Sequence, residues 1–171
     1  MFTLQTRYLS FFFGLISVLS FFNIIYSYYL NLYLNLDTYY FSLIISFLLS
    51  IIFYKIKVNE NKQTIFDKIL TVFFGYLLIP LVLSIPFYLS IYNLTFLNSY
   101  FESISGFTST GFTIFENIKH VDQSLILWRS STQWIGGLYF LFSIIFLIDI
   151  YDDNFKKSLT NFISFNSSEI F

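Results

Sequence analysis

The chain has 171 residues, of which 56% are hydrophobic and only 11% are charged, compared with about 25% charged residues in a soluble domain. A formal net charge of -1 excludes the basic surface that binds nucleic acid. The sequence contains no cysteine, which excludes disulfides, thiolate metal sites and cysteine nucleophiles. The composition therefore predicts an integral membrane protein with an all-α fold.

Four apolar runs are candidates to cross a bilayer, whose core of about 30 Å needs roughly 20 residues of helix, and the second run is short. They cover residues 8–34, 39–54, 69–91 and 124–150. The first run lacks the small-residue cleavage site of a signal peptide, so we expect it to be a transmembrane helix. The predicted organisation is two leading helices with a cytoplasmic loop over residues 1–68, a helix–loop–helix unit over 69–150 and a cytoplasmic tail over 151–171.

The basic residues predict the orientation of these helices, because short cytoplasmic loops carry an excess of lysine and arginine. The connection between the first two runs has none, and Lys119 is the only lysine or arginine in the outer stretch 92–123. The others outside the runs are Arg7, Lys55, Lys57, Lys62, Lys68, Lys156 and Lys157. We therefore expect four membrane spans with both termini in the cytoplasm.

The outer stretch contains the signal for a short helix. Asn98 and Ser99 are typical N-cap residues, and Glu102 stands at the position from which a capping box reaches back to Ser99. The apolar residues Phe101 and Phe107 continue at helical spacing and then stop. A helix of about three turns is too short to cross a bilayer, so we predict a re-entrant half-helix that enters from outside and ends near Phe107.

Residues 106–113, GFTSTGFT, follow this half-helix with small and hydroxyl side chains. Backbone carbonyls beyond a helix end have no helical partners, and a dehydrated cation can take their place. Gly111 permits backbone angles that are closed to residues with a Cβ. The alternative is an ordinary Gly/Ser/Thr turn at the outer surface, which favours the same residues.

Two segments in short succession carry a family resemblance. They are FESISGFTSTGFT at 101–113 and SLILWRSSTQWIGG at 124–137. Together they resemble the first pore repeat of the Trk/Ktr/HKT superfamily of potassium transporters, most closely its TrkH-type bacterial subunits. The resemblance extends over residues 69–150, and the two leading helices suit the same layout. It implies a bacterial cytoplasmic (inner) membrane as the location. It implies four helix–pore-loop–helix repeats about a pseudo-fourfold axis, each of which contributes carbonyls to one potassium filter.

The resemblance implies that Thr108, Ser109, Thr110 and Gly111 form one quarter of the filter, with K+ bound at Ser109 and Thr110. The family often has a threonine where this chain has Ser109. This exchange is mild if backbone carbonyls hold the ion. K+ is then the transported ion, and we expect no other cofactor.

One repeat cannot surround an ion, so we expect the 171 residues to be the N-terminal part of a longer transporter. Two alternatives remain open: a non-conducting membrane assembly subunit and a single-repeat homotetrameric cation channel. The resemblance implies several partners. These are the remaining pore repeats, a second copy of the full subunit in a homodimer, a cytoplasmic nucleotide-binding regulatory subunit and membrane lipid, with no nucleic acid.

Arg129 lies inside the fourth apolar run, where an ionised side chain costs up to about 2.5–3.5 kcal/mol. One interpretation is an ion pair with Glu102 that braces the half-helix against the fourth span. The other is a side chain that extends to the headgroups, beside an aromatic belt of Trp128 and Trp134. In the first interpretation Glu102 and Arg129 are structural supports of the filter.

Two glycines and two prolines predict local features of the spans. Gly136 and Gly137 favour close packing against a neighbouring helix, and a bend near the pore is the alternative. Pro80 and Pro86 lie within the third run and predict kinks, which membrane helices tolerate.

We expect no catalytic residues and therefore no enzyme. Arg129 is nearly the only charge within the spans, whereas catalysis needs a cluster of ionisable groups. The single histidine, His120, has no second nitrogen or sulfur ligand for a metal and is expected to face solvent. An acidic cluster at the end of the fourth run is interpreted as a hydrated helix end: Asp149, Asp152 and Asp153.

Overall fold

The computed structural model describes residues 5–56 and 65–168, with residues 148–168 described by their backbone alone. Within these ranges the chain is helical and contains no strand. In chain order the elements are α1 (Thr6–Tyr29), α2 (Leu36–Lys55), α3 (Ile65–Leu83), α4 (Ile85–Tyr88), α5 (Phe96–Phe107), the 3-10 turn η2 (Ile118–His120) and α6 (Gln123–Ser168).

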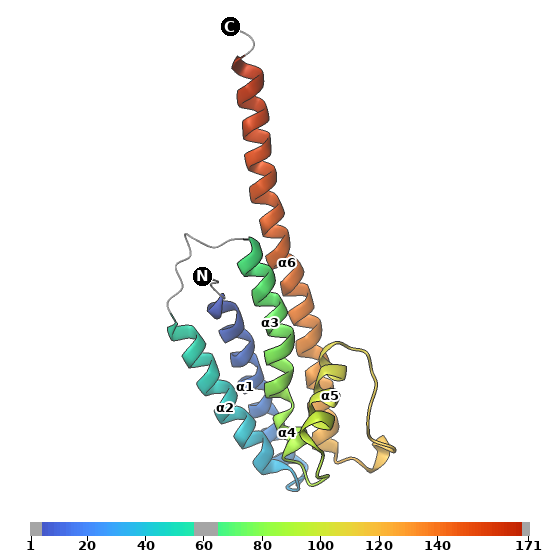
Figure 1. Cartoon of the computed structure of the whole chain (residues 1–171). Helices are drawn as coiled ribbons and strands as arrows, with labels where there is room; N and C mark the ends of the chain where they lie inside the picture. Colours follow the sequence, from blue (N-terminus) through green and yellow to red (C-terminus); the bar gives the residue numbers. More distant parts are fainter. Residues whose placement is uncertain (1–4, 57–64, 169–171) are drawn as a thin grey trace.

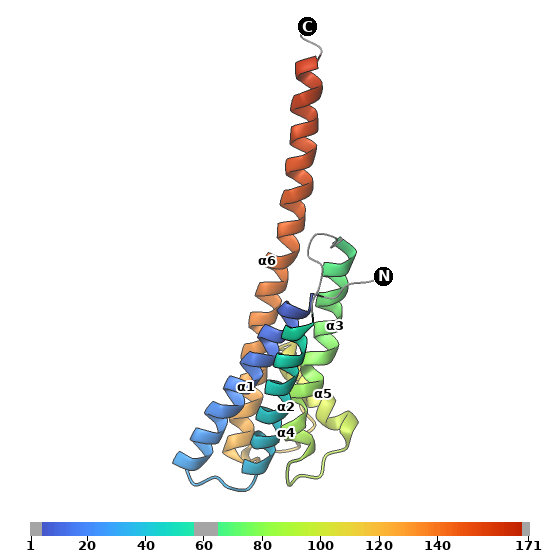
Figure 2. The same ribbon diagram turned by 90° about the vertical axis from the view of Figure 1, so that its left-hand side faces the viewer.

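Four segments of these helices are long and apolar enough to cross a membrane, which confirms the predicted all-α fold with four spans. They are Thr6–Tyr29, Leu36–Lys55, Phe66–Tyr88 and Gln123–Leu147. Their lengths match the roughly 20 residues that a bilayer core requires. The four segments stand side by side as a bundle (Figure 1 and Figure 2).

The hairpin of α1 and α2 is the most closely packed pair in the bundle. Small hydroxyl side chains line the contact: Ser20 donates to Ser42 across 3.1 Å, and Ser10 donates to the carbonyl of Ser50 across 2.8 Å. Small residues let two helix backbones approach closely, and the hydroxyls satisfy each other away from water. The two leading helices therefore form one unit against which α3 and α6 pack.

The third predicted span is interrupted at Ser84. Pro80 lies inside α3, which ends at Leu83, and Pro86 begins α4. The irregularity lies between the two prolines that predict kinks, as an interruption between two helices. Trp128 packs at this break, where its indole Nε1 donates to the carbonyl of Leu83 across 3.0 Å. Trp128 is fully buried, so its predicted place in an aromatic belt is wrong.

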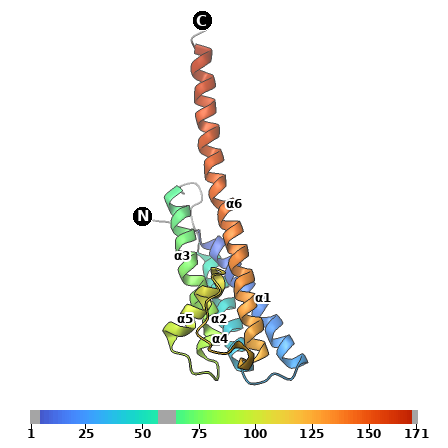
Figure 3. The same ribbon diagram turned by 90° about the vertical axis from the view of Figure 1, so that its right-hand side faces the viewer.

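Helices α5 and α6 both begin at the same end of the bundle (Figure 1 and Figure 3). From its start, α5 runs along the bundle. The chain then returns to the start of α6 through an irregular segment, residues 108–122, which lies outside α5 and α6 (Figure 1). We call it the return segment. This return leaves α5 packed against both α3 and α6.

At the opposite end of the bundle, α6 continues as a helix to Ser168 (Figure 1). The predicted tail at 151–171 is thus a continuation of α6 as far as it is described. Five basic residues of the orientation argument have no described side chain or lie outside the described residues: Lys57, Lys62, Lys119, Lys156 and Lys157. The same holds for the side chains of Asp149, Asp152 and Asp153.

Candidate functional site: the segment after helix α5

Helix α5 starts four residues earlier than the predicted capping box at Ser99 implies. Its N-cap is Thr95, whose hydroxyl oxygen accepts from the backbone N–H of Asn98 across 3.3 Å. Ser99 lies inside the helix, and its hydroxyl donates to the carbonyl of Thr95 across 3.0 Å. The predicted capping box of Ser99 and Glu102 is therefore wrong. Glu102 points instead toward α6 and the segment that follows the helix.

The faces of α5 are inverted relative to a helix on a soluble protein. Its buried residues are Ser99, Glu102, Ser103, Ser105, Gly106 and Phe107. Its exposed residues include Phe96, Leu97 and Phe101. The polar face has partners within the bundle, as shown by the Ser103 hydroxyl, which donates to the carbonyl of Pro80 across 2.5 Å. This arrangement suits an apolar surrounding and positions a polar helix end between α3 and α6.

The helix ends at Phe107, where the sequence predicts its end, and closes with a specific turn. The N–H of Ser109 donates to the carbonyl of Gly106 across 2.9 Å, and the N–H of Thr110 donates to the carbonyl of Ser105 across 3.1 Å. These two bonds define a Schellman motif. Its left-handed residue is Ser109, with φ 56°. Glycine is usual at this position because a Cβ is unfavourable there.

The Schellman turn satisfies the carbonyls of Ser105 and Gly106, whereas those of the three residues that follow the helix are free. Within the described part of the chain, the carbonyls of Thr108, Ser109 and Thr110 accept no hydrogen bond. All three residues are exposed. Gly111 follows with φ 81°, a conformation that L residues with a Cβ rarely adopt. The segment therefore presents three consecutive unpaired carbonyls beyond the negative end of a helix.

Side chains hold this segment to α5. The hydroxyl of Ser105 donates to the carbonyl of Phe112 across 2.6 Å, and the hydroxyl of Thr110 donates to the carbonyl of Ser105 across 3.2 Å. Thus the hydroxyls of Thr108 and Thr110 bond carbonyls of α5, and that of Thr113 bonds the Glu102 carboxylate.

Glu102 and Arg129 are brought together, as one of the two interpretations of Arg129 required. The Nε of Arg129 lies 2.6 Å from Oε1 of Glu102, whose side chain is fully buried. The N–H direction is not aligned with an acceptor, so this contact is an ion pair without a well-formed hydrogen bond. Glu102 also accepts from the Thr113 hydroxyl across 3.0 Å and from the N–H of Ile114 across 3.1 Å.

The other end of the Arg129 guanidinium reaches the segment that follows α5. Its Nη2 donates to the carbonyl of Phe112 across 3.1 Å and to that of Gly111 across 3.3 Å. The Gly111 carbonyl is therefore occupied, unlike those of the three residues before it. Arg129 thus links α6, the buried carboxylate of α5 and the segment after α5, while Glu102 balances its charge.

The adjacent glycines of α6 have different surroundings. A Cβ on Gly136 would overlap the backbone carbonyl of Phe107, so this glycine allows α6 to touch the end of α5. The predicted close packing holds for Gly136. A Cβ on Gly137 would meet no atom within 4 Å, so Gly137 needs no such contact. Sequence alone could not separate the two because both are small residues at the same helix depth.

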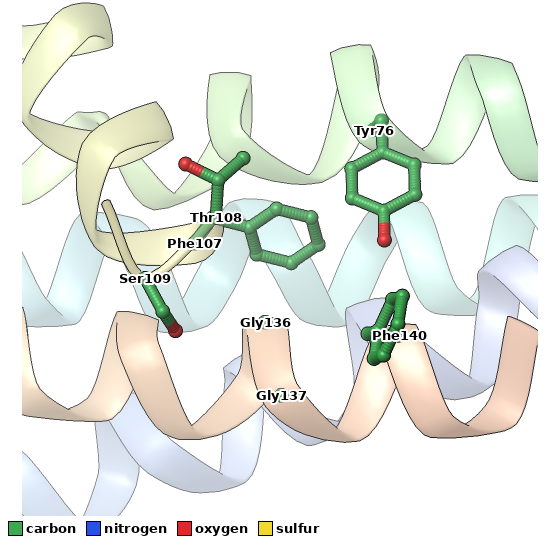
Figure 4. Close-up of a pocket in the computed structure, with 7 residues that line it drawn as sticks. All are labelled: Tyr76, Phe107, Thr108, Ser109, Gly136, Gly137 and Phe140. Carbon is green, nitrogen blue, oxygen red and sulfur yellow. The ribbon is translucent and has the colours of Figure 1, made fainter.

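A pocket of about 350 Å³ lies where α3, the end of α5 and α6 meet. Figure 4 shows Tyr76 of α3 above Phe140 of α6, with the end of α5 beside them. Its lining residues are Tyr76, Phe107, Thr108, Ser109, Gly136, Gly137 and Phe140. The pocket thus includes the two residues at which the unpaired carbonyls begin.

A polar network that the sequence did not reveal ties the return segment to the leading hairpin. The amide Nδ2 of Asn35 donates to Oδ2 of Asp122 across 2.9 Å, and the Oδ1 of Asn35 accepts from the N–H of Ile91 across 3.1 Å. The hydroxyl of Ser124 donates to the same Asp122 oxygen across 2.6 Å. Asn35 is almost fully buried. His120, in contrast, is exposed as predicted.

Three relatives illustrate the comparisons with curated proteins. The chain is 38% identical over 64 residues to an uncharacterized cation transporter of Methanocaldococcus jannaschii, which covers 37% of this chain and 14% of that protein. It is 42% identical over 60 residues, 35% of this chain and 11% of the relative, to the Trk system potassium uptake protein TrkI of Halomonas elongata. It is 39% identical over 46 residues, 27% of this chain and 10% of the relative, to the Trk system potassium uptake protein TrkG of Escherichia coli.

The chain is homologous to the Trk potassium uptake proteins. The matched stretches make up 14%, 11% and 10% of the three relatives. The homology to Trk proteins therefore concerns a small part of each relative. No protein-family profile and no solved structure matches the chain.

Proposed function

We propose that this chain contributes one quarter of a potassium-selective filter in a Trk-type transporter of a cytoplasmic membrane. The remaining three quarters would come from pore repeats outside these 171 residues. The homologous proteins named above are potassium uptake proteins, which supports K+ as the transported ion.

The observation that carries the proposal is the row of unpaired carbonyls at Thr108, Ser109 and Thr110. Carbonyl oxygens arranged in a ring replace the hydration shell of K+ in potassium filters. The negative end of α5 lies directly before these carbonyls and favours a cation. Gly111 supplies the left-handed turn that ends the row. In this proposal Gly111 shapes the filter, because its own carbonyl is bonded to Arg129.

The ion pair of Glu102 and Arg129 supports the same proposal. Arg129 fixes the segment through the carbonyls of Gly111 and Phe112. A free guanidinium beside a cation path would repel the ion, and the carboxylate of Glu102 removes most of that field. The pair therefore acts as a brace that adds little net charge near the filter.

Uptake of K+ by a potassium-requiring bacterial strain tests the proposal. The strain expresses the complete transporter that contains this chain, with Gly111→Ala as the test variant. A Cβ at φ 81° costs about 1–2 kcal/mol and turns the segment away from its conformation. We expect lower uptake and a weaker preference for K+ over Na+.

Asn93→Ala is a matched control, because Asn93 is also left-handed, with φ 50°, and lies in the turn before α5. It should leave K+ selectivity unchanged. Normal selectivity of Gly111→Ala at normal protein level would contradict the assignment of the filter.

The proposal includes an orientation with both termini in the cytoplasm, which the basic residues favour. The cysteine-free sequence makes this testable with single cysteines. Glu116→Cys in the return segment should react with a membrane-impermeant maleimide added outside intact cells. Tyr54→Cys near the end of α2, where the side chain is 70% exposed, should react only after the cells are opened. The reverse pattern would refute the orientation and leave the filter proposal intact.

A further inference from the structure

The pocket beneath the end of α5 has walls that suit an organic cation. Three aromatic rings line it, those of Tyr76, Phe107 and Phe140, and none of its seven lining residues is charged. Figure 4 shows the hydroxyl end of Tyr76 directed toward Phe140. Its volume of about 350 Å³ falls within the range of about 300–1,000 Å³ for small-molecule pockets. Aromatic faces attract quaternary ammonium groups through their quadrupole.

The backbone at the pocket adds negative potential. Thr108 and Ser109 line it, and their carbonyls accept no hydrogen bond within the described part of the chain. The end of α5 contributes the negative end of its dipole. An apolar lipid chain would fill the same walls but gain nothing from this negative potential. A cation with an apolar surface satisfies both features.

The space for such a ligand depends on the two adjacent glycines of α6, Gly136 and Gly137. Gly136 is used for packing, since a Cβ there would overlap the Phe107 carbonyl. Gly137 lines the pocket, and a Cβ there would meet no atom within 4 Å. The missing side chain at Gly137 therefore gives no packing advantage to the fold and leaves the pocket open.

We propose that this pocket is a binding site for a small quaternary ammonium cation and that Gly137 keeps it open. The ligand is bound by the rings of Tyr76 and Phe140 on either side and by the carbonyl end of α5. This site shares Thr108 and Ser109 with the proposed potassium filter, but its test follows binding of the organic cation and does not depend on transport.

The probe is tetraethylammonium, titrated against the purified chain in lipid nanodiscs and followed by saturation-transfer NMR. Phe140→Ala removes one ring and should weaken binding about 5-fold. Gly137→Leu fills the pocket and should abolish binding. Leu141→Ala is the matched control, because Leu141 neighbours Phe140 on α6 with nearly the same exposure, 57% against 55%, and does not line the pocket. It should leave the affinity unchanged.

The proposal is overturned if tetraethylammonium does not bind the unaltered chain, or if all four proteins bind it equally. It is also overturned if a lipid chain occupies the pocket and tetraethylammonium fails to displace it. Circular dichroism checks that each variant keeps its helix content. If the Gly137→Leu variant loses helicity, the Gly137→Ala variant is tested in its place. The smaller side chain of alanine should weaken binding less than that of leucine. Equal binding by the folded Gly137→Ala and Phe140→Ala variants and the unaltered chain would refute the site.

Discussion

Replacing Glu102 by glutamine tests the brace between α5 and α6 most directly. Glutamine has nearly the shape of glutamate and keeps an oxygen that can accept from Thr113 or Ile114. It removes the charge that lies 2.6 Å from Nε of Arg129. The guanidinium then remains in the bundle without a counter-charge, with its side chain 17% exposed. The change therefore isolates electrostatics from packing.

Loss of one partner from a buried ion pair costs about 3–5 kcal/mol. Because part of the Arg129 side chain reaches the surface, we take the lower end, about 3 kcal/mol, for Glu102→Gln. With the scaling of soluble domains of this size, the melting temperature should fall by roughly 6–12 °C. Thermal unfolding of the purified chain in detergent, followed by circular dichroism, measures this shift.

The control is Glu116→Gln. Glu116 is an exposed glutamate in the return segment, so this change should alter the melting temperature little. The double variant Glu102→Gln with Arg129→Gln completes a mutant cycle. It should be more stable than Glu102→Gln alone, because no uncompensated charge is left. If the two single effects add, or if Glu102→Gln melts like the unaltered chain, the charge pair does not brace the two helices.

Three further substitutions test other contacts, each by the free energy of unfolding in detergent. Gly136→Ala should destabilise the chain by about 1–3 kcal/mol, because the added Cβ overlaps backbone of α5; an unchanged stability would mean that α6 does not touch α5 there. Asp122→Asn should lower the free energy of unfolding by about 1.5–3 kcal/mol, because it weakens the bond to Asn35. If the two residues act together, adding Asn35→Ala to Asp122→Asn should lower the free energy of unfolding little further. Trp128→Phe keeps the packing but loses one indole hydrogen bond, so a cost of about 1 kcal/mol is expected, and a cost near zero would show that the bond is replaced.

The spans could be predicted from sequence because run length is a local property. The thickness of a bilayer determines how many apolar residues a spanning helix needs, so the four runs could be found without knowing how the helices pack. The end of α5 at Phe107 was also visible, since the apolar spacing stops there. The start of α5 was not, because Thr95, Asn98 and Ser99 are all good N-caps and only the folded backbone selects among them.

Contacts between distant segments account for what the sequence did not reveal. Asn35 and Asp122 are 87 residues apart, and neither residue type signals the other. Trp128 was expected at the interface because tryptophan is common there, but the break at Ser84 provides a buried carbonyl for its indole. The Glu102–Arg129 pair was one of two options, and a helical sequence alone cannot decide whether an arginine turns inward or outward.

The inverted polarity of α5 bears on the order in which the protein is assembled during synthesis. Its buried face carries Glu102, and an ionised residue at the middle of a bilayer costs about 2.5–3.5 kcal/mol when its partner is missing. That partner, Arg129, lies on α6, which the ribosome makes later. Until α6 has entered the membrane, the newly made α5 is more stable in water or at the headgroups. In the proposed re-entrant arrangement, we therefore expect α5 to be among the last parts of the unit to insert, even though it precedes α6 in the chain.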